Sequence, residues 1–244
     1  MKVIGSIQAR MSSTRLPGKV LKEIAGKPML LRQIERIKRS RLLDEVVVAT
    51  TVNTSDDAIV DLCRRHGIPF YRGSEEDVLG RVSGLVREWK ADVHVEFFGD
   101  SPLTDAHIID EAVGFYLKNA PRYDFVSNSI KTTYPPGQEI IVYRGSALLE
   151  ADAETASDDP LREHVSIHLT RCPGRFKVFG LEAPPYYCFP DIYLEVDTPQ
   201  DFAVISAIVR HFVDRGMDYF SLSQILDFLA AHPELTETNR DVPR

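Results

Sequence analysis

The sequence is poor in cysteine and has no long apolar segment, and each shortage excludes a class of protein. The three cysteines, Cys63, Cys172 and Cys188, are far apart and form no Cys-x-x-Cys pair. This pattern argues against a disulfide framework and against a zinc site, and we expect a reducing, cytoplasmic environment. No run approaches the roughly 18 apolar residues of a membrane helix. Met1-Lys2 leads only into a short apolar segment, so we expect neither membrane insertion nor a signal peptide.

A positive net charge is also missing. The formal net charge of −7 argues against a protein that binds nucleic acid over a broad surface. Residues 1–41 are the exception, because they hold eleven Lys or Arg and only two Glu, a local charge of +9 that leaves −16 for the remainder. We therefore expect an anion to bind near this end of the chain. With 244 residues and 43% hydrophobic content, we expect residues 1–244 to form a single domain.

A polar loop over residues 8–19 is the best candidate for that anion site. It follows the apolar run at 3–7, which predicts a buried strand. Its cations are Arg10, Arg15 and Lys19. Its small residues, which allow backbone N–H groups to approach a ligand, are Ala9, Ser12, Ser13 and Gly18. The loop lacks both the P-loop pattern and Gly-x-Gly-x-x-Gly, so it predicts another kind of polyphosphate site, with a plain exposed basic loop as the alternative.

Apolar runs and amphipathic segments alternate through the first half of the chain. The runs at 45–50, 68–71 and 93–98 predict strands, and helical patterns lie between them. This alternation predicts an α/β, Rossmann-like fold with a mostly parallel central sheet and helices on both faces. From Tyr123 the rhythm changes, which predicts antiparallel pairing or a smaller inserted β/α flap. We expect residues 129–190 to be an insertion that closes over an acceptor or meets a second subunit.

Polar residues follow three of the predicted strands. The segment 72–77 follows the third strand, where α/β sheets bind ligands, although Ser74 and Asp77 also match a helix-capping box. Asp100 follows the fourth strand and is suited to hold a divalent cation, unless it only forms an Asx-turn. Residues 193–197 predict a last strand, in which alternation places Glu195 and Asp197 on one face.

The C-terminal part of the sequence predicts further helices. A helix over 160–171 would place His164 and His168 one turn apart, but not in the order of a zinc protease. Thr198-Pro199 predicts the start of a helix, and the capping box at 221–224 predicts another. The polar tail from Pro233 predicts a loose terminus.

Taken in order, these motifs resemble the cytidylyltransferase superfamily that makes CMP-activated sugars. The spore-coat-polysaccharide cytidylyltransferase-like group is most similar, and the 3-deoxy-manno-octulosonate and acylneuraminate enzymes are related. The matching segments are 8–19, 73–78, 99–103, 162–165 and 196–199. The resemblance implies Mg²⁺-dependent transfer of CMP from CTP to an acidic sugar or related acceptor, with release of pyrophosphate, for surface polysaccharide or lipopolysaccharide biosynthesis. It also implies a homodimer.

The resemblance implies roles for individual residues as well. The triphosphate would be held by Arg10, Arg15 and Lys19, and Mg²⁺ by Asp100 and Asp197, with Glu195 as a third ligand. Nucleotide contacts would come from Gln8, Ala9, Ser12, Ser13, Arg72, Ser74 and Asp77. Acceptor contacts would come from Asn128, Glu139 and His164.

Two other functions fit the same residues. A glycosyltransferase shares the nucleotide-binding architecture, but it usually has Asp-x-Asp after the fourth strand, and Gly99-Asp100-Ser101-Pro102 lacks the second Asp. A non-catalytic nucleotide-binding protein is the other alternative. The sequence departs from the family at 136–142, where an acidic residue is missing, so an acid or a polyol remains open as acceptor.

Overall fold

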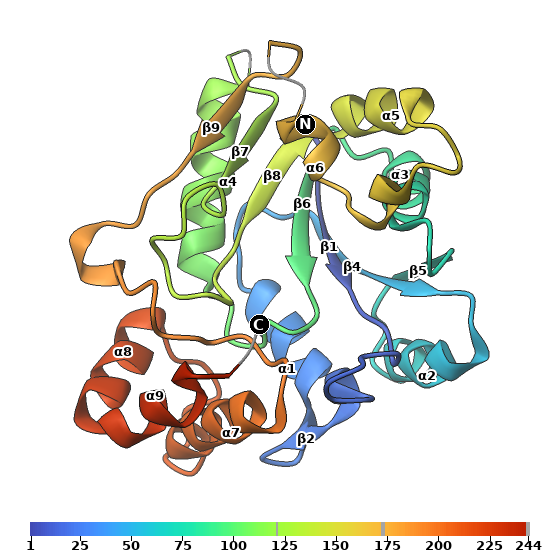
Figure 1. The fold of residues 1–244 in the computed structure, drawn as a ribbon. Helices are drawn as coiled ribbons and strands as arrows, with labels where there is room; N and C mark the ends of the chain where they lie inside the picture. The colour runs from blue at the N-terminus through green and yellow to red at the C-terminus, as the bar shows by residue number, and fades with distance from the viewer. Residues whose placement is uncertain (121, 172–173, 243–244) are drawn as a thin grey trace.

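The computed structural model describes residues 1–120, 122–171 and 174–242, and it shows a seven-stranded sheet covered by helices on both faces (Figure 1). The strand order is β5-β4-β1-β6-β8-β7-β9. The strands are β1 (Val3–Gln8), β4 (Glu45–Thr51), β5 (Phe70–Gly73), β6 (Val93–Phe98), β7 (Phe125–Ser127), β8 (Ile141–Arg144) and β9 (Val178–Gly180). In this sheet β8 alone runs antiparallel to its neighbours, which confirms the predicted α/β fold with a mostly parallel sheet. A separate ribbon pairs β2 (Glu23–Ile24) with β3 (Lys27–Pro28).

The helices alternate with the strands over most of the chain. The α-helices in the described residues are α1 (Met29–Ile37), α2 (Asp57–Arg65), α3 (Val78–Trp89), α4 (Ala106–Asn119), α5 (Gly145–Glu154), α6 (Ile167–Thr170), α7 (Pro199–Val213), α8 (Leu222–Ala231) and α9 (Pro233–Arg240). Short 3₁₀ turns are η1 (Lys19–Leu21), η2 (Thr54–Asp56), η3 (Pro160–Glu163) and η4 (Pro185–Tyr187). Helix α7 begins as predicted, with Thr198 in a capping box and proline in the first turn.

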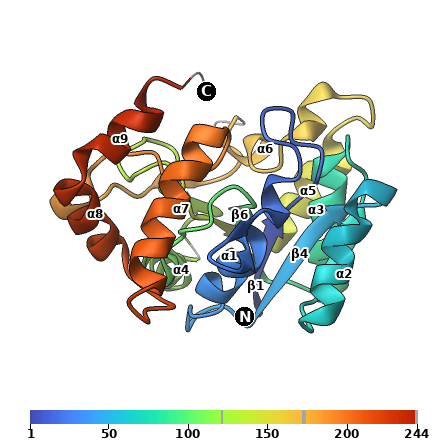
Figure 2. The ribbon, with the colours of Figure 1, turned by 90° about the horizontal axis from the view of Figure 1, so that it is seen from below.

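Side-chain alternation along the strands separates two apolar cores. Val3 and Ile7 of β1 face the core that includes α1, α4, α7 and α8, whose arrangement is seen from below in Figure 2. Ile4 faces the other core, which includes α3, α5 and α6. On β6 the same alternation sends Val93, Val95 and Phe97 to the first core, and therefore directs His94 and Glu96 to the opposite face. The polar members of an otherwise apolar strand thus lie together on the α3 and α5 side.

The predicted insertion contributes to the same sheet. Within residues 129–190, β8 pairs with both β6 and β7, and β9 pairs with β7. Helices α5 and α6 pack with α3 over one face. Because these strands continue the central sheet, the inserted segment is attached along the edge of the sheet. Figure 1 shows α5 and α6 in the upper part of the view, near the N-terminus, and Gly145 N at the start of α5 donates to Asp92 O just before β6, at 2.8 Å.

Three local predictions were wrong. The helix predicted over 160–171 is broken into η3 and α6, because His164 is extended, with φ −119° and ψ 137°, and Val165 enters the core. His164 and His168 are therefore not one helical turn apart. Residues 193–197 form no strand, because their amides bond to two different loops: Leu194 N donates to Pro136 O at 2.7 Å and Val196 N to Asp100 O at 2.8 Å.

The tail from Pro233 is the third correction. It forms α9, and the Asn239 side chain, which is 2% exposed, donates to Tyr193 O at 3.2 Å and to Asp201 Oδ1 at 2.9 Å. One buried amide thus ties the polar tail to the start of α7.

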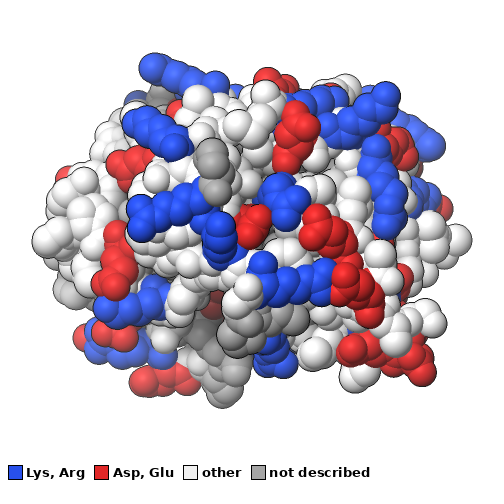
Figure 3. All heavy atoms as spheres, turned by 90° about the horizontal axis from the view of Figure 1, so that it is seen from above, with Lys and Arg blue, Asp and Glu red and all other residues white. Residues whose placement is uncertain are grey.

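The surface carries charges of both signs. The face seen in Figure 3 carries Lys and Arg interspersed with Asp and Glu. None of the helices in the described segments has the length and apolar character needed to cross a membrane. Cys63 and Cys188 are free thiols, and Cys172 lies outside the described residues.

Candidate active site

The loop after β1 is held against the sheet at several points. Ala9 N donates to Ala49 O of β4 at 3.1 Å, and Met11 N donates to the buried Asp56 carboxylate at 2.8 Å. Gly18 closes the loop by donating to Met11 O at 3.0 Å, and its φ of 67° is a conformation that glycine adopts without strain. The loop therefore starts and ends on rigid structure, and Figure 2 shows it, in dark blue, extending toward the start of α7.

The loop between β6 and α4 approaches β1 closely enough to require glycine. Gly99 N donates to Gln8 O at 2.9 Å, and a Cβ at position 99 would lie 2.7 Å from that same oxygen. The close approach places Asp100 beside the basic loop. Asp100 O then accepts from Val196 N at 2.8 Å, which brings the segment before α7 to the same place.

Lys19 joins the two carboxylates that the resemblance paired. Its ammonium lies 3.3 Å from Asp100 Oδ2 and 2.9 Å from Asp197 Oδ1, and it donates to Val196 O at 2.7 Å. Arg15 contacts the other oxygen of Asp197 at 2.6 Å. Two carboxylates from distant parts of the chain therefore converge on cations of the loop, as the sequence predicted.

These residues line a pocket of about 640 Å³ at the carboxyl ends of β1 and β6. The predicted residues in its lining are Gln8, Ala9, Arg10, Ser12, Ser13, Arg15, Lys19, Asp100, His164 and Asp197. Its remaining lining residues are Thr14, Val20, Glu75, Glu76, Val78, Arg81, Phe98, Gly99 and Glu163. Most of the predicted nucleotide and phosphate residues are thus gathered on one concave surface.

Three predicted nucleotide residues do not line this pocket. Arg72 holds the loop after β4, because its guanidinium donates to Thr51 O at 2.7 Å and pairs with Asp57 at 2.7 Å. Asp77 is the N-cap of α3, and Ser74 Oγ accepts from Asp77 N at 3.0 Å. Capping, the alternative left open by the sequence, is therefore the contact that the structure shows for Ser74 and Asp77.

Arg162 gives Asp77 a second structural partner. Its guanidinium makes two bonds to the Asp77 carboxylate, at 2.9 and 3.0 Å, and one to Asp152 at 2.7 Å. Arg162 is 8% exposed, so its guanidinium is largely shielded from water where it bridges α3, α5 and η3, although the Asp77 side chain is 39% exposed. It anchors the segment that carries Glu163 and His164 into the pocket.

Sequence reasoning missed Arg81, which lines the pocket from α3. It is 5% exposed, its Nε has no hydrogen-bond partner among the described residues, and another of its nitrogens donates to Ser74 O. Burial lowers the pKa of Arg81, and the positive charge of Arg10 lowers it further. The signal that could have identified Arg81 from the sequence is its position as an arginine inside the apolar pattern of a predicted helix. Its charge suits a polyanion that would enter between it and Arg10.

A second cavity, of about 410 Å³, adjoins the first. It is lined by Gln8, Glu96, Phe98, Phe125, Ser129, Ile130, Glu163, His164, Val165, Ser166, Ile167 and Thr170. Four of these, Gln8, Phe98, Glu163 and His164, also line the larger pocket. The two spaces are therefore neighbours that share a wall.

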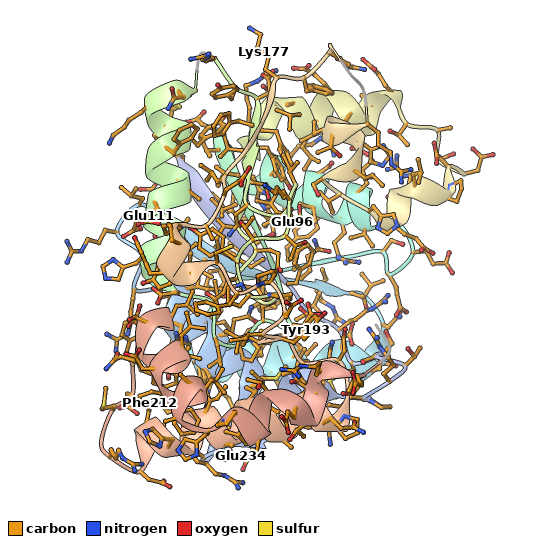
Figure 4. The ribbon with its side chains drawn as sticks, turned by 60° about the vertical axis from the view of Figure 1, so that its left-hand side comes forward. Glu96, Glu111, Lys177, Tyr193, Phe212 and Glu234 are labelled. Carbon is orange, nitrogen blue, oxygen red and sulfur yellow. The ribbon has the colours of Figure 1, made fainter. Side chains whose placement is uncertain are left out.

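Glu96 is the buried acid of this second cavity, and it too was missed. Figure 4 shows it in the interior of the molecule, whereas the labelled Lys177 and Glu234 lie at opposite ends. Its two oxygens accept from Gln8 Nε2 at 2.7 Å and from Tyr143 Oη at 3.3 Å. Burial raises the pKa of Glu96 to about 7, an effect that these two hydrogen bonds oppose. Glu96 is thus a buried carboxyl group in the lining of the second cavity.

The three predicted acceptor residues have different surroundings. His164 lines both cavities. Asn128 is committed to the backbone, since it donates to Gln138 O at 2.8 Å and accepts from Ile140 N at 2.7 Å. Glu139 accepts from Gly137 N, and its pKa is raised to about 7 by burial and by the charges of Glu195 and Asp100. Asn128 and Glu139 line neither cavity.

The donor set suits Mg²⁺ bound together with a polyphosphate. Asp100 and Asp197 offer carboxylate oxygens in the pocket, whereas Glu195 lies outside its lining, near Glu139. In the described part of the chain no three His, Cys, Asp or Glu side chains are grouped to hold a metal unaided. Mg²⁺ typically takes one or two protein carboxylates and completes its shell with phosphate oxygens and water, so two carboxylates fit that requirement.

Comparisons with known proteins agree with this geometry. Residues 4–223 match the family model described as cytidylyltransferase. The spore coat polysaccharide biosynthesis protein SpsF of Bacillus subtilis is 30% identical over 240 residues, 96% of this chain and 97% of that protein. The 3-deoxy-manno-octulosonate cytidylyltransferase of Geobacter sulfurreducens is 37% identical over 137 residues, 55% of this chain and 53% of that protein.

Among solved structures, a cytidylyltransferase from Leptospira borgpetersenii superposes with a TM-score of 0.91 and 28% identity, over 100% of both chains. The likeness therefore extends to the segments around both cavities.

Proposed function

The chain belongs to the cytidylyltransferase family, and from this premise we propose that it transfers CMP from CTP to a hydroxyl of a sugar-related acceptor in a Mg²⁺-dependent reaction. Membership makes it a CTP-dependent nucleotidyltransferase. The observation that carries the proposal is the pocket in which Arg10, Arg15 and Lys19 meet Asp100 and Asp197. Cations for phosphates and carboxylates for a metal stand together there, at the strand ends where α/β sheets bind nucleotides.

The chain's own residues perform binding and charge stabilisation. Arg10, Arg15, Lys19 and Arg81 bind the triphosphate, and each charge-assisted bond contributes about 1.5–3 kcal/mol. Asp100 and Asp197 hold Mg²⁺, which when bound supplies Lewis-acid stabilisation of the phosphate charge. On nucleotide binding Lys19 exchanges its carboxylate partners for phosphate oxygens. The segment around Gln8 and Ala9 and the residues Glu75 and Glu76 border the base.

The reaction needs no covalent protein intermediate. A hydroxyl oxygen of the acceptor attacks the α-phosphorus in line and gives up its proton to solvent, the bond from that phosphorus to the bridging oxygen breaks, and pyrophosphate leaves with the electron pair. The cations of the loop stabilise the negative charge that grows on the leaving group. Contacts with Asp100 and Asp197 position Arg15 and Lys19 for this role.

We further propose a cytoplasmic homodimer that acts in the biosynthesis of a surface polysaccharide or lipopolysaccharide. The relatives named for spore coat polysaccharide and for 3-deoxy-manno-octulosonate support this setting. Tyr186 and Phe189, which are exposed in the 129–190 segment, support a contact with a second copy. Light scattering at working concentration tests the dimer, and a monomer alone would contradict it.

Pyrophosphate release is the direct test. We expect release with CTP and Mg²⁺ when a suitable acceptor is present, with much less from ATP, GTP or UTP, and none from the Lys19→Ala variant. A glycosyltransferase would instead consume a nucleotide sugar without releasing pyrophosphate. Binding of CTP without turnover, over a broad acceptor panel, would favour a non-catalytic nucleotide-binding protein.

A further inference from the structure

We propose that the acceptor is an uncharged polyhydroxylated molecule of sugar size, which occupies the second cavity and donates a hydroxyl hydrogen bond to Glu96. The inference rests on the proposed function and names the substrate class that the same site takes. It departs from the acidic sugar that the resemblance implied. Position, charge and hydrogen-bonding capacity of the cavity support it independently.

The position of the cavity is that of an acceptor site. It shares Gln8, Phe98, Glu163 and His164 with the pocket that holds the cations and Asp100. A molecule inside it would therefore lie next to a nucleotide in the larger pocket. Its volume of about 410 Å³ lies within the range of roughly 300–1,000 Å³ that is usual for small-molecule pockets.

The charge of the cavity disfavours a carboxylate ligand. Its lining, among the residues that the structure describes, contains Glu96 and Glu163 but neither Arg nor Lys. Proteins recognise carboxylates mainly through the paired donors of arginine or through lysine. An acidic ligand would instead bring a second negative charge beside a buried carboxyl group, which costs free energy in a poorly solvated space.

Three arginines of the surrounding segments are already engaged elsewhere. Arg162 adjoins Glu163 in sequence, but its guanidinium is bound by Asp77, by Asp152 and by Thr155 O. Arg10 and Arg81 line the larger pocket only, where a triphosphate would take them. Their charges are therefore directed at the nucleotide.

Glu96 has spare capacity to bind a hydroxyl group. One oxygen accepts from Gln8 and the other from Tyr143, while a carboxylate offers about four lone-pair sites. Glu96 is 2% exposed, so its remaining sites are reached only from within the cavity. Burial raises the pKa of Glu96 to about 7, and in its protonated form the group also donates a hydrogen bond to a hydroxyl oxygen.

The rest of the lining suits a polyol as well. Phe98 and Phe125 supply aromatic surface for the C–H groups of a sugar, and Ser129, Ser166 and Thr170 supply hydroxyl partners. A mixture of apolar walls with a few polar groups is typical of small-molecule sites.

Matched pairs of ligands test the inference. The protein is first saturated with Mg²⁺ and a non-hydrolysable CTP analogue. We then titrate it calorimetrically with a series of alditols and, for each alditol, with the aldonate that has the same number of carbons. The acidic sugar 3-deoxy-manno-octulosonate is included in the panel. We expect at least one alditol to bind, and to bind at least about tenfold more tightly than its aldonate. Tighter binding of the acidic member, or no binding of any alditol while the CTP analogue binds, overturns the inference and leaves the proposed function intact. Failure to bind the CTP analogue overturns the proposed function instead.

Variants separate a role in acceptor specificity from a role in folding. Glu96→Gln is expected to weaken alditol binding about tenfold while the affinity for the CTP analogue is retained, and the exposed Glu88→Gln on α3 is the charge-matched control. If Glu96→Gln does not fold, Ser166→Arg adds a cation to the same lining and is expected to improve aldonate binding relative to its alditol. Unchanged selectivity in the folded variant overturns the inference.

Discussion

The ammonium group of Lys19 lies 2.9 Å from Oδ1 of Asp197, which joins residues 178 positions apart in the sequence. Lys19 follows the first strand and Asp197 precedes α7, so the contact closes the pocket across the carboxyl edge of the sheet. Their opposite charges neutralise one another, which explains how a mostly buried ammonium and a carboxylate are both accommodated in the pocket lining.

Replacing Lys19 with alanine is expected to weaken CTP binding by at least about tenfold, since the lost charge-assisted bond contributes about 1.5–3 kcal/mol. Isothermal titration with CTP and Mg²⁺ measures the effect. Lys22→Ala removes an exposed lysine from the same region and is the matched control. Equal CTP affinity of the Lys19 variant and the wild type would remove Lys19 from the phosphate site.

The Asp100→Asn variant is expected to bind CTP but to lose about a hundredfold or more of its Mg²⁺-dependent pyrophosphate release, because a neutral amide is a poor Mg²⁺ ligand. Steady-state rates over a Mg²⁺ titration measure the change, and Asp61→Asn, on the exposed face of α2, serves for comparison. Full activity would exclude Asp100 from the metal site.

Arg162→Met is expected to lower the free energy of unfolding by about 2–3 kcal/mol, because it leaves Asp77 and Asp152 without their shared cation. The effect stays below that of a fully buried pair, since the Asp77 side chain is 39% exposed. Urea denaturation measures it. The exposed Lys131, which pairs with Glu182, provides the control variant Lys131→Met, which should leave stability nearly unchanged. Similar midpoints for the two variants would contradict the structural role of Arg162.

Glu96 predicts a pH dependence of stability. Burial raises its folded-state pKa from 4.5 to about 7, so between these values the folded protein retains a proton that the unfolded chain releases. The stabilisation is therefore complete below about pH 4.5 and is lost as the pH rises to about 7, by an amount on the order of 3 kcal/mol.

Urea unfolding of the wild type and of the Glu96→Gln variant across this pH range tests whether ionisation of Glu96 lowers the free energy of unfolding as the pH rises. The difference in stability between them should shift in favour of the variant as the pH rises, because glutamine cannot ionise. Glu139, whose pKa is also raised to about 7, is present in both proteins and cancels in the difference. A difference that does not change with pH would show that Glu96 does not titrate as described.

Local sequence patterns predicted an element correctly where the interactions that form it act between residues close together in the sequence. The apolar runs at 45–50 and 93–98 form β4 and β6, since strand periodicity and β-branched residues act over a few positions. The first turn of α7 followed from Thr198-Pro199 for the same reason. The basic loop was recognised from its own cations and small residues.

Local sequence patterns gave wrong predictions where the hydrogen-bond partner of a group lies far away in the sequence. The 193–197 segment looked like a strand, but its amides bond to Pro136 and Asp100 in two separate loops. The tail looked loose because its polar residues have no local partner, although Asn239 bonds to Tyr193 and Asp201.

The sequence by itself determined the α/β architecture, and it singled out the basic loop and the two carboxylates as candidate site residues, because each has a short-range signal of periodicity, capping or charge. Only the tertiary structure decided that Asp77 bonds to Arg162, that Arg81 lines the larger pocket, and that Glu96 lies in a second cavity without lysine or arginine in its described lining. These outcomes depend on which side chains share a buried space. That property is set by the packing of helices and sheet, and no window of neighbouring residues contains it.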